Sequence, residues 1–248
     1  MKLINYIKYS NEQFDNHINE IMSGNKFMLK ISANSAFIIF SILFVLSFFV
    51  KSIEASKLLY LVFAVLMLMF VIANRLIKES SNSTRIMMHI LAALLISFSI
   101  VLGTYLSADL TAAIFLILLI LLPILFVENI VISTLTTLLY VISFSFCAIY
   151  FKESAVYSID IINAVTAFVI SLVTISIISR IKLRDLILQD NLITLSNEDE
   201  LTKLFNRRYI NNYFSEMNDT FQNDEKDFGV LILDIDDFKD YNDTYGHL

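Results

Sequence analysis

Carboxylates gather near the end of the sequence, directly after a short apolar run. Residues 229–233 read Gly-Val-Leu-Ile-Leu, and Asp234 and Asp236 follow them. The run predicts a buried strand, and residues two apart on a strand lie on the same side. Two carboxylates at the end of a strand suit a hard cation such as Mg²⁺, which takes one or two carboxylates together with waters and substrate phosphates.

A helix is expected to begin at Phe238, with Lys239 near its first turn. Backbone N–H groups at a helix N-terminus favour phosphate, so the whole segment suggests a site for a metal-bound nucleotide. Taken alone, an Asp-x-Asp pair after a strand is a weak signal. A structural role as caps and turn residues is about as well supported by this segment by itself.

A second motif precedes this segment and makes the pattern far more specific. The two stretches read Asp199-Glu-Leu-Thr-Lys-Leu-Phe-Asn-Arg-Arg208 and Asp234-Ile-Asp-Asp-Phe-Lys-Asp-Tyr-Asn-Asp-Thr-Tyr-Gly-His247. Together they closely resemble the N-terminal part of GGDEF-domain diguanylate cyclases, over about residues 197–248. Lys203 departs from that family, which usually has glycine there. The rest of the chain is only compatible with the family in its architecture.

The resemblance implies an activity, a cofactor and a fold. The implied reaction condenses two GTP to cyclic di-GMP with Mg²⁺ (or Mn²⁺) as cofactor, and the implied fold is the start of an α+β, ferredoxin-like nucleotidyl cyclase palm. By resemblance, Asp234 is catalytic and binds the metal, assisted by the carbonyl of Ile235 and by Asp236. Lys239 neutralises phosphate charge in the transition state.

The remaining matched residues receive binding or structural roles. The resemblance places Asn242 on the guanine edge and the backbone amides around Asp237 and Phe238 on the GTP phosphates. Four others order the turn and the first helix of the domain: Asp199, Asn206, Arg207 and Arg208.

The composition indicates a membrane protein. The chain is 57% hydrophobic and 17% charged, with a mean hydropathy of +0.70, whereas soluble domains are about half apolar and a quarter charged. Six apolar stretches are long enough to cross a bilayer as helices, which needs about 20 residues. They cover 31–50, 58–77, 86–106, 110–127, 130–150 and 159–179. We therefore expect a mostly α protein with a six-helix transmembrane bundle.

The basic residues predict the orientation of these spans. One side of the expected topology holds Lys2, Lys8, Lys26, Lys30, Arg75, Lys78, Arg85, Arg180, Lys182 and Arg184, and the other holds Lys51, Lys57 and Lys152. By the positive-inside rule both termini are cytoplasmic. With the resemblance, this predicts a multi-pass protein of the bacterial plasma membrane that contacts lipid. No basic patch large enough for a nucleic-acid partner is present.

Few polar residues lie within the expected spans, which disfavours a transporter. Asp109, Glu128 and Asp160 are expected at span ends, where water reaches them. His89, near the start of the third span, is interpreted as an interfacial or helix-packing histidine. A role in binding haem or another ligand is the less favoured alternative for it.

A signalling helix is expected where the last span leaves the membrane, over residues 180–198. The a and d positions of one heptad frame hold Ile178, Ile181, Asp185, Leu188, Leu192 and Leu195, which predicts a two-stranded coiled coil and hence a homodimer. The alternative is an ordinary amphipathic helix packed on its own domain. Residues 1–30 are interpreted as an amphipathic segment on the membrane surface, and a disordered tail is the alternative.

The expected domains are therefore the amphipathic segment 1–30, a sensory membrane module over 31–179, the helix 180–198 and a GGDEF domain begun at 199–248. None of the 4 glycines is adjacent to another, so the Gly-Gly-acidic-acidic-Phe loop is absent. We expect a membrane-anchored diguanylate cyclase sensor that is active when complete, and a catalytically incomplete fragment in these residues. The alternative is a non-catalytic membrane receptor whose degenerate domain binds nucleotide or a partner.

Overall fold

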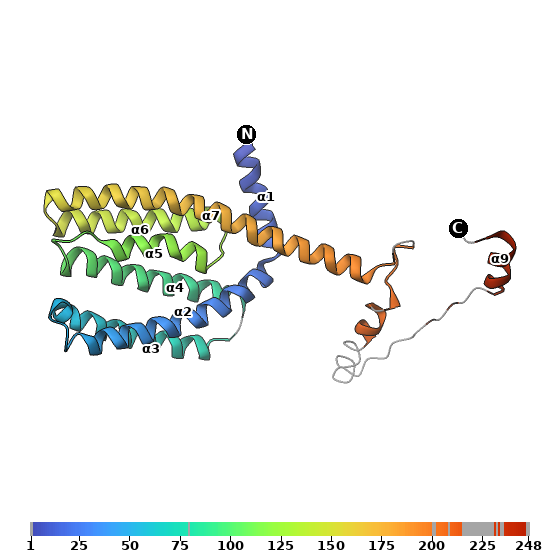
Figure 1. The fold of residues 1–248 in the computed structure, drawn as a ribbon, viewed down its shortest axis with the longest axis horizontal. Helices are drawn as coiled ribbons and strands as arrows, with labels where there is room; N and C mark the ends of the chain where they lie inside the picture. Colours follow the sequence, from blue (N-terminus) through green and yellow to red (C-terminus); the bar gives the residue numbers. More distant parts are fainter. Residues whose placement is uncertain are drawn as a thin grey trace. The chain divides into compact units, whose positions relative to one another are not determined.

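The computed structural model describes residues 2–78, 80–199, 202–207, 209–214, 231, 233 and 236–246, with side chains for all of these except 2–8, 194–196, 242 and 245. The described chain is mostly helical and divides into two compact units, Met1–Leu188 and Gln189–Leu248 (Figure 1). Within those ranges, pairing between extended segments is confined to one antiparallel bridge, between Glu198 and Phe205.

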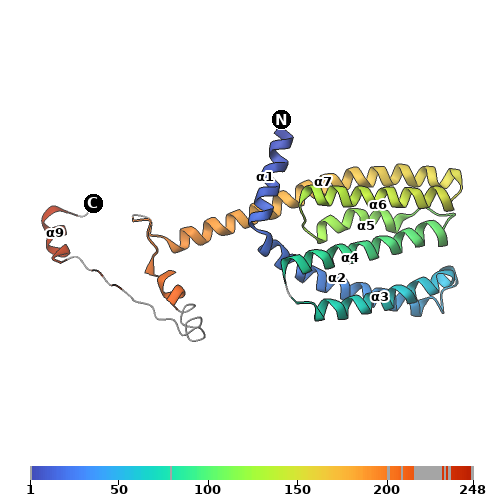
Figure 2. The ribbon, with the colours of Figure 1, turned by 180° about the vertical axis from the view of Figure 1, so that it is seen from behind.

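The first unit is a helical bundle. Its elements are α1 (Lys2–Asn16), α2 (Ile18–Leu46), the 3₁₀ helix η1 (Lys51–Ser56), α3 (Lys57–Leu76), α4 (Ser81–Ile100), the π-helix η2 (Val101–Leu106), α5 (Ala113–Leu125), α6 (Ile130–Phe151) and most of α7 (Ser154–Asn197), whose last residues belong to the second unit. Helices α2 to α7 lie side by side in both views of the ribbon (Figures 1 and 2). α7 is a single helix of 44 residues.

Five helical stretches are long and apolar enough to cross a membrane, where the sequence predicted six spans. They are Ile18–Leu46, Lys51–Leu76, Ser81–Leu106, Ile130–Phe151 and Ser154–Ile193. The expected span 110–127 contains only α5, a helix of 13 residues, which rises about 20 Å against the roughly 30 Å of a hydrocarbon core. Residues 110–127 form one apolar run when hydropathy is averaged along the sequence, but the backbone is helical in only part of this run.

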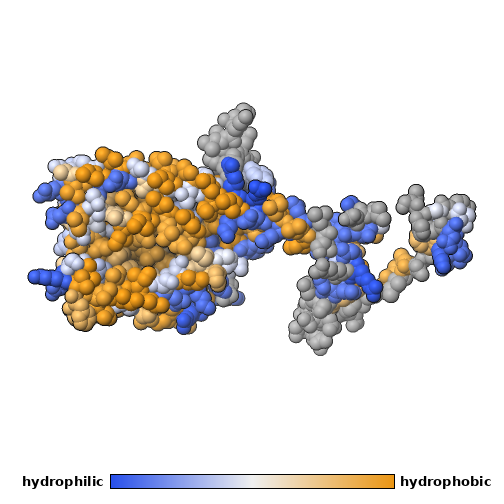
Figure 3. All heavy atoms as spheres, viewed as in Figure 1, coloured by the Kyte–Doolittle hydropathy of each residue, from blue (hydrophilic) through white to orange (hydrophobic). Residues whose placement is uncertain are grey.

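The surface of the bundle is apolar along the helices. Exposed large side chains include Ile38, Leu58, Ile117, Phe146 and Ile162. Hydrophobic residues dominate the visible face of the bundle and hydrophilic ones gather at its two ends (Figure 3). Because soluble monomers rarely expose apolar surface on this scale, the pattern fits helices surrounded by lipid.

Buried side chains satisfy the backbone around the short helix α5. The side chain of Asn25 forms two hydrogen bonds with Val127, donating to its carbonyl at 2.6 Å and accepting from its N–H at 2.9 Å. Pro123 lies inside α5 and has no N–H to donate to the carbonyl of Leu119. The hydroxyl of Ser171, on α7, donates to that carbonyl at 2.8 Å. Such partners are needed because an unpaired backbone group in an apolar interior costs several kcal/mol.

An ion pair satisfies the backbone ahead of α5. Lys152 and Asp160 form a salt bridge with side chains 0% and 1% exposed. The Lys152 ammonium also donates to the carbonyl of Leu110 at 2.7 Å, and Asp160 accepts from the N–H of Ala112 at 3.1 Å. The expectation that water reaches Asp160 is therefore wrong. Asp160 lies at the end of an apolar run in the sequence. It is buried in the fold because its partners, Lys152 and Ala112, come from other segments of the chain.

The turn of chain before α5 also depends on a glycine. Gly103 lies in η2, and a Cβ placed on it would approach the Cβ of Ala112 to 2.8 Å. This close approach explains the small residue there. A π-helical turn widens the backbone locally, and here it lies directly against the segment that leads into α5.

A second, smaller apolar cluster closes the end of the bundle near the N-terminus. It consists of Phe14, Ile21, Met22, Val127 and Leu183, with Ile18, Ile178 and Leu186 packed against it. We expected residues 1–30 to lie on the membrane surface. The apolar side chains of residues 14–22 pack against the protein itself instead. Leu183 of α7 belongs to this cluster. The helix therefore contacts the N-terminal segment of the chain where it leaves the bundle.

Replacement of one member of the buried ion pair tests its role. We expect Asp160→Asn to lower the free energy of unfolding by about 3–5 kcal/mol, because it leaves the Lys152 charge buried without a counter-charge. The double variant Lys152→Met/Asp160→Asn should lose less, since the asparagine still accepts from Ala112. Thermal unfolding in detergent measures this, with Lys51→Met as the exposed control. A single variant as stable as the parent would contradict the assignment.

Candidate functional site

Asp199 organises a tight turn at the end of α7. Its carboxylate accepts hydrogen bonds from the N–H and the hydroxyl of Thr202, both at 2.9 Å. The backbone of Asp199 also donates to the carbonyl of Leu204 at 2.8 Å and accepts from the N–H of Lys203 at 2.9 Å. The Asp-x-x-Thr spacing places a carboxylate where these donors would otherwise lack a partner, as in turns built by aspartate.

Asn206 joins this turn to the next helical stretch, residues 207 and 209–214. Its side-chain oxygen accepts from the N–H of Tyr209 at 3.1 Å, which is an N-cap interaction. Its own N–H donates to the carbonyl of Asn197 at 2.7 Å. The turn and the helix start are thus held by Asp199 and Asn206, and Arg207 is exposed. Arg208 lies outside the described residues.

Lys203 adopts a backbone conformation that favours glycine. Its φ is +59°, in the left-handed region where an L side chain costs roughly 1–2 kcal/mol. The sequence shows lysine where the resembled family usually has glycine. The turn formed by Asp199 requires a positive φ at this position, and glycine adopts a positive φ without strain. This explains why glycine is usual there.

The second motif leads into α9, Phe238–Tyr245. Asp237 precedes the helix with φ +55°, a conformation that aspartate tolerates better than most residues, and its carbonyl accepts from the N–H of Tyr241 at 3.0 Å. The side chains of Asp236, Asp237, Phe238 and Lys239 are exposed. Because the first helical bond is made by Tyr241, the preceding amides of α9 have no partner within the helix.

Other expected site residues lie wholly or partly outside the described residues. Asp234 and Ile235 lie outside the described residues, as does the side chain of Asn242. The expected strand 229–233 lies mostly outside them too. Leu231 and Leu233 are described, belong to no strand and are 82% and 83% exposed. No group of three or more potential metal ligands occurs among the described residues, so the magnesium site and the start of the palm stay predictions.

A buried polar group inside the bundle was not foreseen. Glu128, only 4% exposed, accepts from Arg85 Nε at 2.7 Å and Nη2 at 2.6 Å. His89 Nε2 lies 3.3 Å from the same carboxylate, and the N–H of Asn129 donates to it at 2.8 Å. Burial raises the pKa of Glu128, but the hydrogen bonds from His89, Arg85 and the N–H of Asn129 outweigh it and lower the pKa overall. The expectation that Glu128 lies at a span end open to bulk water is therefore wrong, because the side chain is enclosed by these partners. The signal in the sequence was Glu128-Asn129, the polar break between two apolar runs.

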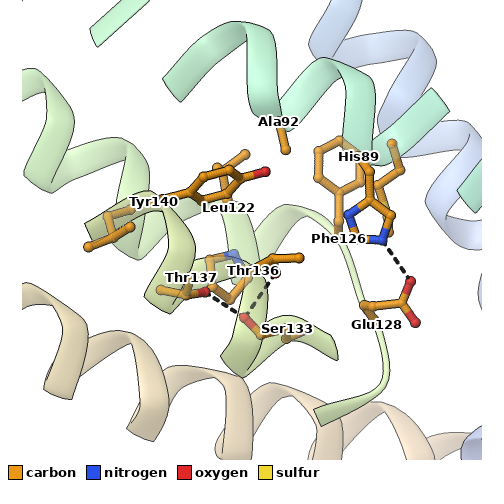
Figure 4. A pocket seen from close by; sticks show the side chains of 12 residues that line it. His89, Ala92, Leu122, Phe126, Glu128, Ser133, Thr136, Thr137 and Tyr140 are labelled. Atoms are coloured by element: carbon orange, nitrogen blue, oxygen red, sulfur yellow. Dashed lines mark hydrogen bonds and ion pairs between the residues drawn. The ribbon is translucent and has the colours of Figure 1, made fainter. Parts of the chain in front are cut away.

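A cavity of about 50 Å³ opens beside Glu128, between α4, α5 and α6 (Figure 4). His89 and Glu128 lie at one side of it, and Tyr140, Thr136, Thr137 and Ser133 line the other. The cavity is large enough to admit water, since one molecule needs about 10–15 Å³ of such space. His89 thus packs between helices, in line with the favoured interpretation, but its partner is an acid on the loop before α6.

Comparisons with known proteins concern the C-terminal segment. The family model described as "Diguanylate cyclase, GGDEF domain" matches residues 196–248. The bifunctional diguanylate cyclase/cyclic di-GMP phosphodiesterase MucR of Pseudomonas aeruginosa is 41% identical over 56 residues, which are 23% of this chain. The match spans 8% of the length of that relative. No solved structure matches the chain.

Substitution of Lys203 tests the strained turn. We expect Lys203→Gly to slow hydrogen exchange of the amides of residues 203–206 by up to about tenfold. Relief of roughly 1–2 kcal/mol of left-handed strain is offset by about 0.5–1 kcal/mol of added freedom in the open state. Exchange measured by mass spectrometry on the whole chain in detergent reports it. Lys203→Ala, which removes the same side chain and keeps the strain, should leave exchange unchanged. Equal slowing in both variants would contradict the explanation.

Proposed function

Residues 196–248 are a GGDEF-domain segment, and on that premise we propose that the chain belongs to a membrane-anchored diguanylate cyclase controlled by its helical bundle. The activity condenses two GTP to cyclic di-GMP and two pyrophosphates. Each 3′-hydroxyl attacks the α-phosphate of the other GTP, and pyrophosphate leaves. The proposal concerns the whole protein, because the matched stretch holds only the first part of such a domain.

The continuity of α7 carries this proposal. The helix begins at Ser154 among the apolar helices and ends at Asn197, where the GGDEF match starts at residue 196. No glycine or proline interrupts it. A change in the bundle that shifts or turns α7 is therefore passed along a regular helix to the Asp199 turn, because such a helix has no built-in hinge.

The chemistry is proposed to lie ahead of α9. Mg²⁺, held by Asp234 with the carbonyl of Ile235 and with Asp236, would supply charge neutralisation at the phosphates. Lys239 is exposed in the first turn of α9, where its ammonium can reach a phosphate. The amides of that turn have no partner within the helix, which suits an anion. Asn242 is proposed to bind the guanine edge.

Two copies of the chain are needed because each domain is proposed to hold one GTP. Ile181, Leu188 and Leu192 on α7 are 48%, 47% and 65% exposed, and they belong to the heptad frame seen in the sequence. Leu183 lies on another face of the helix and is buried in the N-terminal cluster. We propose that the exposed stripe pairs with the same stripe of a second copy as a parallel coiled coil.

The metal assignment is tested by Asp234→Ala in the open reading frame that contains these residues, read through to its stop codon. Purified protein with GTP and Mg²⁺ should form cyclic di-GMP, measured by chromatography. The variant should lose about 100-fold or more of this rate, because a bound metal contributes several kcal/mol.

Asp240→Ala is the matched control, since Asp240 is an exposed carboxylate on α9 with no proposed role. It should keep the parent rate. An Asp234→Ala variant as active as the parent would remove the metal assignment. A parent protein that binds GTP without forming product would favour the alternative of a non-catalytic receptor.

Dimerisation through α7 is tested by cysteine cross-linking. In a Cys147→Ser background, Leu188→Cys and Leu192→Cys should each form disulfide-linked dimers in membranes, because parallel helices bring equivalent a and d residues together. Asp190→Cys, exposed on the opposite face, should cross-link far less. Gel electrophoresis without reductant gives the yields. Equal yields at the three positions would mean random collision and contradict the proposed pairing.

A further inference from the structure

A polar groove opens between α2 and α3 at the end of the bundle where α2 begins and α3 ends. Its volume is about 430 Å³. Three cationic side chains line it, Lys26 and Lys30 from α2 and Arg75 from α3, together with the amides of Asn34 and Asn74. We propose that this groove binds the phosphate headgroup of an anionic phospholipid.

The arrangement of charges calls for an anion. Lys30 lines the groove from α2, one helical turn after Lys26. Arg75 adds a third positive charge from the last turn of α3. The described residues that line the groove include no carboxylate, and within the described chain no ion pair is formed by Lys30 or Arg75. A phosphate would supply a counter-charge for Lys30 and Arg75.

The polar donors of the groove match a phosphodiester. Lys30 and Arg75 are exposed, whereas Asn34 and Asn74 are partly buried deeper along the two helices. Arginine presents paired N–H groups that fit phosphate oxygens, and lysine adds a point charge. Amide N–H groups can donate to the remaining oxygens or to the glycerol of a headgroup.

The depth of the groove points to a lipid as the source of the phosphate. Lys30 is the last charged residue of α2, and Arg75 closes the apolar run of α3. The cations therefore lie where hydrocarbon meets headgroups, the level at which basic pockets between helices hold anionic lipid heads. Phe27 and Val71 line the groove, and exposed Ile31, Ile72 and Leu76 lie nearby in sequence. They offer an apolar path for an acyl chain.

A general excess of positive charge at this end of the bundle would not make a site. Lys78 and Lys182 are also exposed and do not line the groove. They provide a matched control with the same change in net charge. The site predicts that the positions of the lost charges decide binding, whereas a diffuse surface potential predicts that only their number does.

The test is native mass spectrometry of the delipidated chain in detergent, titrated with phosphatidylglycerol. The parent should bind one lipid in preference to phosphatidylcholine. Lys30→Gln/Arg75→Gln should weaken that binding about 30-fold, the loss expected for two cations at a membrane surface. Lys78→Gln/Lys182→Gln should bind as the parent does. Lys30→Arg/Arg75→Lys, which keeps both charges, should bind within a few-fold of the parent and shows that a folded groove is retained.

Three results would overturn the proposal. Equal weakening by both charge-removing pairs would show a diffuse surface effect. Equal binding of phosphatidylcholine would show that the phosphate is not recognised through net charge. Displacement of the lipid by inorganic phosphate at equal concentration would assign the groove to a soluble anion. None of these outcomes depends on cyclic di-GMP synthesis, so the lipid site and the proposed activity fail or succeed separately.

Discussion

An apolar bundle cannot leave backbone amides and carbonyls without partners, and this constraint explains the arrangement around α5. Each irregular stretch there is matched by a buried polar side chain from another helix. Asn25 pairs with Val127 after the helix, Ser171 serves the carbonyl freed by Pro123, and Asp160 accepts from Ala112 before it. A short helix between non-helical segments is stable inside lipid only when protein groups replace the missing bonds. The neighbours of α5 are thus fixed by hydrogen bonding as well as by packing.

A second group of polar contacts joins several helices at the end of the bundle near the N-terminus. Arg85 binds Glu128 and also lies over the ring of Phe14, with its guanidinium carbon 5.8 Å from the ring centroid. Phe14 and Val127 belong to the cluster that holds Leu183. The loop before α6 therefore contacts α1, α2, α4 and α7 within a few residues. A change at the small cavity beside His89 has a contiguous physical route to the helix that leaves the bundle.

Local signals in the sequence predicted much of this protein, and long-range partners account for what they missed. Apolar runs predicted the positions of the membrane helices because each helix satisfies its own backbone. The run 110–127 gave a helix of 13 residues instead of a span, because Pro123 and the bonds to Asn25 and Asp160 stabilise non-helical backbone on either side. The burial of Glu128 and Asp160 could not be read locally, since Arg85 and Lys152 become neighbours only in the folded bundle.

In the segment that matches the GGDEF model, some features could likewise be predicted from the local sequence and others could not. Its identity was readable because the motif residues act within a few positions of one another, as the Asp199–Thr202 and Asn206–Tyr209 bonds do. The positive φ at Lys203 could not be predicted from the lysine itself, and the only hint was the glycine that the resembled family usually has there. The proposed metal ligands Asp234 and Ile235 lie outside the described residues.

The packing of Leu183 has a consequence for how α7 faces its surroundings. Leu183 and Leu188 are five residues apart, so they point about 140° away from each other around the helix axis. Because Leu183 is packed in the cluster with Phe14 and Met22, α7 cannot rotate freely about its axis. The direction in which Leu188 faces is fixed as a result. In the proposed pairing, the orientation that α7 offers to a second copy is therefore set within the single chain.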